Sequence, residues 1–217
     1  MLRTVDDLMH GERRFAAGAG EVPWTAMALI VSGASFLYGA VMGSFGVRPL
    51  QMLYSGLKVP LLLGVSTLIC LPSIFVLNTV MGLRRDLSAV MRGLLVSQGT
   101  VAVTLASLAP ITAFMYLSTT GYELAKSLNA LIFLVAALAG QITLARHYRP
   151  LIAADPRHRL ELTAWLVLYL FVAIQMAWLL RPFIGAPDRP PEFLRDEPWD
   201  NAYVQLFRAV ASALAGD

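Results

Sequence analysis

The chain has 217 residues, of which 57% are apolar and only 14% are charged. Soluble domains carry about 25% charged residues, so this composition excludes an ordinary soluble enzyme. The net charge of +3 is too small and too dispersed for a nucleic-acid-binding protein. The length predicts one domain.

Five windows of the sequence contain none of the 31 charged residues, and they are 24–45, 59–82, 93–118, 127–145 and 162–180. Each window has 19 to 26 residues, and about 20 apolar residues cross a bilayer as a helix. The sequence therefore predicts an all-α polytopic membrane protein, with a five-span domain over 24–184. An N-terminal segment over 1–23 and a C-terminal segment over 185–217 flank it.

The N-terminal segment is polar, and its first apolar run is too long for a cleavable signal peptide. Thr4 and Asp7 have the spacing of a helix cap, so residues 4–17 could form a short amphipathic helix on the membrane surface. A partly ordered polar tail is the alternative. The first span is expected to remain in the membrane as a signal anchor.

The first span carries small residues at every fourth position, namely Ser35, Gly39 and Gly43. Such rows let two helix backbones approach closely. The row predicts either a contact between helices of one chain or a contact between copies in an oligomer. In the second span, Pro72 predicts a kink, and Asn78 is expected to bond to a neighbouring helix.

The third span is the most polar of the five. Its hydroxyl side chains recur at helical spacing on one face, at Ser97, Thr100, Thr104 and Ser107. Hydroxyls in membrane helices commonly bond to their own helix or to the next one. The alternative interpretation is a path or cavity lined by these hydroxyls.

The fourth span has a polar residue near its outer end, Asn129, followed by two small residues, Ala136 and Gly140. The small pair predicts another close helix contact.

The fifth span contains one amide, Gln175, within its apolar stretch. Trp165 and Trp178 lie towards opposite ends of this span, where membrane proteins place their aromatic belts. Arg181 follows at the expected outer boundary and could reach the headgroups. We therefore interpret these three residues as interface anchors.

The C-terminal segment begins with a proline-rich connector. A helix is predicted from Asp200 onwards, because apolar residues there follow helical spacing, at Tyr203, Leu206, Phe207, Val210 and Leu214. This amphipathic helix is expected to lie on the outer membrane interface or on a partner.

The loops between spans predict an orientation. With the N-terminus in the cytoplasm, seven basic loop residues lie inside and three lie outside, which agrees with the positive-inside rule. The C-terminus is then outside. Fifteen arginines against two lysines favour a bacterial inner-membrane protein.

No catalytic machinery is apparent in the sequence. The five windows contain no Asp, Glu, Lys, Arg or His, so we expect neither an enzyme nor a bound cofactor, and no proton relay within the spans. His147, Asp155, His158 and Glu161 share one predicted cytoplasmic loop. Their spacing matches no metal motif, which favours a solvated loop over a metal site.

Several segments resemble an uncharacterised bacterial branch of the Yip-domain family, the Yip/Rab-interacting five-span membrane proteins. They are Leu57–Pro60, Ile69–Ser73, Phe75–Asn78, Ala109–Thr112 and Gln175–Phe183. The resemblance covers about residues 24–210, and it implies a role in membrane organisation without catalysis. The Asp-Leu-x-Gly-Pro motif of the eukaryotic members is missing here, so Rab binding is not implied.

Two hypotheses follow. The first is a non-enzymatic membrane protein that assembles with itself or with a partner membrane protein, motivated by the small-residue row and the amphipathic ends. The second is a passive channel or carrier for a small neutral solute, which would use the hydroxyl face of the third span.

Overall fold

The computed structural model describes residues 24–118, 121–185 and 190–194. They form α2 (Trp24–Met42), α3 (Pro49–Val80), α4 (Leu87–Ser118), α5 (Tyr122–Ala154) and α6 (His158–Leu179), with a short 3-10 turn, η2 (Arg84–Asp86), between α3 and α4. All five helices are long and apolar enough to cross a membrane. The predicted all-α fold class is therefore confirmed.

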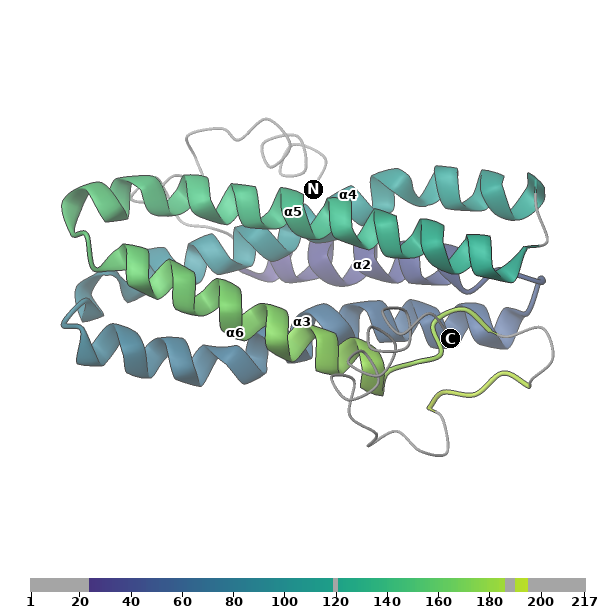
Figure 1. Ribbon diagram of the computed structural model, residues 1–217, viewed down its shortest axis with the longest axis horizontal. Helices are drawn as coiled ribbons and strands as arrows, with labels where there is room; N and C mark the ends of the chain where they lie inside the picture. The colour runs from purple at the N-terminus through teal and green to yellow at the C-terminus, as the bar shows by residue number, and fades with distance from the viewer. Residues whose placement is uncertain (1–23, 119–120, 186–189, 195–217) are drawn as a thin grey trace, which may run out of the picture.

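Successive helices run back and forth along one long axis (Figure 1). The turns at 81–86 and 155–157 lie together at one end, which we call the α3–α4 end. The connection at 43–48 and the segment that follows α6 lie at the other end, the α2–α3 end.

Four helices are longer than the windows predicted, and three of them exceed 30 residues. α3 and α4 have 32 residues and α5 has 33, which correspond to about 48–50 Å against a hydrocarbon core of about 30 Å. α3 begins ten residues before the window that predicted it, at Pro49, because proline is well tolerated in the first turn of a helix. A window defined by the absence of charge ends at the first charged residue, whereas the backbone hydrogen bonds of the helix continue past that residue.

The glycine row of α2 packs against α3 within the chain. A Cβ atom on Gly39 would overlap the Ser55 carbonyl oxygen, and one on Gly43 would lie 2.9 Å from the Cα of Met52. Ser35 is also buried and bonds back to the Val31 carbonyl. The row is thus a contact between helices of one chain, and an oligomer contact through these glycines is excluded by α3.

The close approach predicted in the fourth span joins α5 to α4. Ala136 is fully buried, and a Cβ atom on Gly140 would lie 3.2 Å from the Ser97 carbonyl oxygen. These small residues let α4 and α5 pack along their lengths.

α6 is the peripheral helix. It packs mainly on α3 and less on α5, and only 11% of its most apolar window is buried, against 28–39% for the other four helices. The predicted N-terminal helix over 4–17, the C-terminal helix with Tyr203 to Leu214 and most of the proline-rich connector lie outside the described residues.

Candidate functional site

Three of the four hydroxyls on the predicted face of α4 bond to carbonyl groups. Ser97 donates across to the Gly140 carbonyl of α5 at 2.9 Å. Thr100 and Ser107 donate to carbonyls of their own helix at 3.0 and 2.9 Å, and Thr104 is half-buried. These bonds are typical of packed membrane helices, so they give no support to a hydroxyl-lined path.

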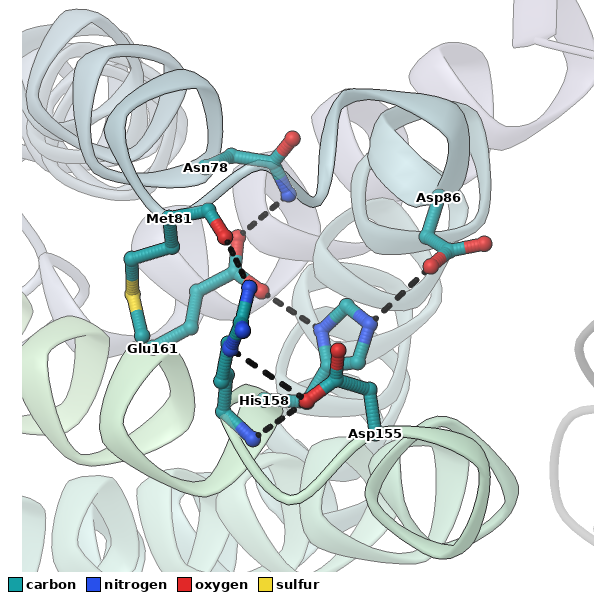
Figure 2. A network of polar contacts seen from close by, with 7 residues as sticks. Asn78, Met81, Asp86, Asp155, His158 and Glu161 are labelled. Atoms are coloured by element: carbon teal, nitrogen blue, oxygen red, sulfur yellow. Dashed lines mark hydrogen bonds and ion pairs between the residues drawn. The ribbon is translucent and has the colours of Figure 1, made fainter.

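A cluster of buried polar side chains lies at the α3–α4 end (Figure 2). Asn78 Nδ2 donates to Glu161 Oε1 at 2.9 Å, and His158 Nδ1 lies 2.9 Å from Glu161 Oε2. The other ring nitrogen of His158 lies 3.2 Å from Asp86 Oδ2. We call these four residues the Glu161 cluster, and it joins α3, η2 and α6. The prediction that Asn78 bonds to another helix is confirmed.

Local structure explains how these residues meet. His158 is the first residue of α6 and Glu161 lies three residues later, so both side chains occupy one face of its first turn. A carboxylate is also favoured near a helix N-terminus. The Arg157 Nη1 atom donates to the Met81 carbonyl at 3.0 Å, which holds the two turns together and brings Asp86 to His158.

The interpretation of this region as a solvated loop is wrong. His158 and Glu161 are fully buried, and His147 is 7% exposed. His147 belongs to α5, where its Nε2 lies 3.0 Å from the Ala89 carbonyl oxygen of α4. Within the described ranges, no group of three or more His, Cys, Asp and Glu side chains is arranged to hold a metal ion.

The imidazole of His158 bridges two carboxyl groups from different elements. Its Nδ1 faces Glu161 of α6, and its Nε2 faces Asp86 of η2. The ring thereby ties the first turn of α6 to the turn between α3 and α4.

The sequence did not predict this cluster, because the predicted fifth span begins at residue 162, just after His158 and Glu161. His158, Glu161 and Trp165 are spaced by three and four residues and form one buried face. Extending the helical periodicity towards the N-terminus would have found them. Trp165 is 1% exposed and stacks on Tyr169 at 5.1 Å, so its assignment as an interface anchor is wrong.

The other predicted anchors lie together at the opposite end of α6. The Arg181 guanidinium lies 3.5 Å from the centre of a Trp178 ring, a cation–π contact. Gln175 is half-buried on α6, three residues before Trp178.

A second polar cluster joins three helices near the α2–α3 end. Tyr38 donates to Asn129 Oδ1 at 2.8 Å, and Asn129 Nδ2 donates to the Tyr116 hydroxyl at 2.7 Å. Tyr116 in turn donates to the Met42 carbonyl at 3.1 Å. Asn129 is thus a link between α2, α4 and α5.

Lys58 is a buried residue of α3, although the sequence placed it in a loop. Its Nζ donates to the Pro182 carbonyl at 2.6 Å and lies 5.2 Å from the centre of the Phe193 ring. Gln51 of the same helix donates to the Phe183 carbonyl at 3.0 Å. These contacts hold the segment that follows α6 against α3.

No family model, curated protein or solved structure matches this chain. The described residues form an all-helical membrane protein with five helices that fit a lipid bilayer, and polar clusters near both ends join these helices.

Proposed function

We propose that this chain is a non-enzymatic integral membrane protein that acts as a membrane-organising or assembly component of a larger complex. The observation that carries the proposal is the position of α6, which has the least buried apolar window of the five helices. A peripheral helix of this kind is the natural place for a second helix to pack.

The outer face of α6 supports such a contact. Val167 and Leu170 are 66% and 62% exposed and lie three residues apart, on one face. A second copy of the chain or another membrane protein could cover them. Because α3 covers Gly39 and Gly43 of α2, these glycines cannot contact another chain. We therefore expect the contact with a second chain on α6.

The polar contacts of the described helices are consistent with a scaffold. They link α3 to α6, α4 to α5, and α2 to both α4 and α5. The resemblance to Yip-like proteins implies a role of the same kind, in membrane organisation. We place the protein in a bacterial inner membrane with its N-terminus in the cytoplasm.

Cysteine cross-linking in native membranes tests the proposal. The one cysteine of the chain, Cys70, is fully buried, so Cys70→Ala provides a suitable background. Val167→Cys on α6 should form a cross-linked species under mild oxidation. Leu138→Cys, on the exposed face of α5, is the matched control and should remain monomeric.

Native mass spectrometry of the wild-type chain in mild detergent gives the second readout. Oligomers or a co-purifying membrane protein would support the proposal. If the chain is monomeric and Val167→Cys cross-links no more than Leu138→Cys, the proposal is wrong.

A further inference from the structure

The α3–α4 end carries a group of arginines that no acidic side chain of the described residues balances. We call this group the arginine collar, and it consists of Arg84, Arg85, Arg92, Arg146, Arg149 and Arg159. Arg92 is half-buried and the other five are exposed. They come from η2, from the first two turns of α4, from the last turns of α5 and from the start of α6.

The described acidic residues at this end are already engaged. Asp86 and Glu161 both face His158. Asp155 accepts from the Arg157 backbone N–H at 2.9 Å, and its carboxylate lies 4.0 Å from the Arg157 Nε atom. The collar therefore presents its positive charge outwards, because the neighbouring carboxylates serve other groups.

The basic groups at the α2–α3 end are arranged differently. Lys126 pairs with Glu123 at 2.7 Å, Lys58 donates to backbone carbonyls, and Arg181 lies over Trp178. Each of these cations has a partner within the chain. The two ends thus differ in how far their positive charge is compensated.

The collar lies directly beside the apolar outer surface. Ile142 is 52% exposed and precedes Arg146 by one helical turn, so both occupy the same face of α5. Leu160 is 59% exposed and adjoins Arg159. In a bilayer the apolar side chains face the hydrocarbon, and arginines next to them reach the level of the lipid phosphates.

We propose that the arginine collar binds the phosphate groups of anionic lipids in the leaflet at the α3–α4 end. Guanidinium groups bind phosphate oxygens through two parallel hydrogen bonds. Anionic headgroups also supply the negative charge that the described residues do not provide there. The arginines adjoin the apolar surface, which favours a lipid over a soluble acidic partner. A lipid offers a charged headgroup to the arginines and acyl chains to the apolar side chains.

Native mass spectrometry of the full chain in mild detergent tests this proposal with two lipids of identical acyl chains, phosphatidylglycerol and phosphatidylcholine. The chain should bind phosphatidylglycerol more tightly. Since each arginine near a membrane surface contributes about fivefold to such binding, Arg146→Gln with Arg149→Gln should weaken it by about 25-fold. The control pair, Arg48→Gln with Lys126→Gln at the other end, should change it by less than about twofold.

Three results would overturn the proposal. Equal binding of the two lipids would remove the preference for anionic headgroups. An equal loss in the control pair would show that net charge matters and the collar does not. Displacement of the lipid by millimolar inorganic phosphate would identify a site for free phosphate.

A folding control accompanies these measurements. Unchanged melting temperatures of both double variants establish that they are folded.

Discussion

At the scale of single residues, the most unusual feature is a buried histidine and a buried glutamate near the end of a membrane-spanning helix. A buried charge is costly unless hydrogen bonds and partners compensate it. One carboxyl oxygen of Glu161 accepts a hydrogen bond from Asn78, and the other faces His158 Nδ1. The Nε2 atom of His158 faces Asp86. Each member of the cluster thus depends on the others.

Glu161→Ala should destabilise the protein by about 3 kcal/mol or more, because breaking a buried, hydrogen-bonded pair leaves its partners uncompensated. Thermal unfolding in detergent measures the change. Thr163→Ala is the matched control on the same helix, since its exposed hydroxyl bonds only to the Arg159 carbonyl. Equal melting temperatures for the two variants would contradict a structural role for the cluster.

At the scale of helices, α2 and α3 are held at a distance that only glycine permits at two positions. The Ser55 carbonyl occupies the place of a Cβ atom on Gly39, whereas nothing lies within 4 Å of such an atom on Gly33. Both glycines belong to α2. The same helix therefore offers a packed glycine and an unpacked one.

Gly39→Ala should lower the free energy of unfolding by about 1–3 kcal/mol, because α2 must move away from α3. Gly33→Ala should raise it by about 0.5–1 kcal/mol, since alanine favours the helix. Chemical denaturation of both purified variants in the same detergent gives the comparison. A loss of stability in both, or in neither, would show that the contact in the structure does not determine the packing.

The boundaries of the helices show where hydropathy is a poor guide. The absence of charge locates the apolar middle of each helix, but α3 continues through Lys58 and α5 continues past Arg146 to Ala154. Lys58 is tolerated because its amine donates to the Pro182 carbonyl. The sequence cannot reveal this contact, since the two residues are 124 positions apart.

At the scale of the whole molecule, the two ends differ in charge compensation. The arginines that no described acidic residue compensates lie at the α3–α4 end, which the predicted cytoplasmic loops form. The five spans of the described residues place the start of α2 and the end of α6 on opposite sides of the membrane. We therefore expect the C-terminus outside, next to the α2–α3 end.

Fusion of reporters to the C-terminus tests this orientation in a bacterial host. Alkaline phosphatase, which is active only outside the cytoplasm, should be active there, and a green fluorescent protein should remain dark. Bright fluorescence with inactive phosphatase would reverse the orientation, and it would place the arginine collar in the outer leaflet. Fusions to the connection at 43–48 should behave as the C-terminal ones do.

The sequence by itself determined the number of spans, their order and the helical class, because the hydrocarbon core excludes charge and requires each backbone segment to satisfy its own hydrogen bonds. Those requirements act locally, so composition along the chain reveals them. The tertiary structure decided which polar groups pair. Asn78 and Glu161 are 83 positions apart and His158 and Asp86 are 72 apart, and only the packing of α3, η2 and α6 brings them within hydrogen-bonding distance. The same packing turned Trp165 from an expected interface anchor into a core residue.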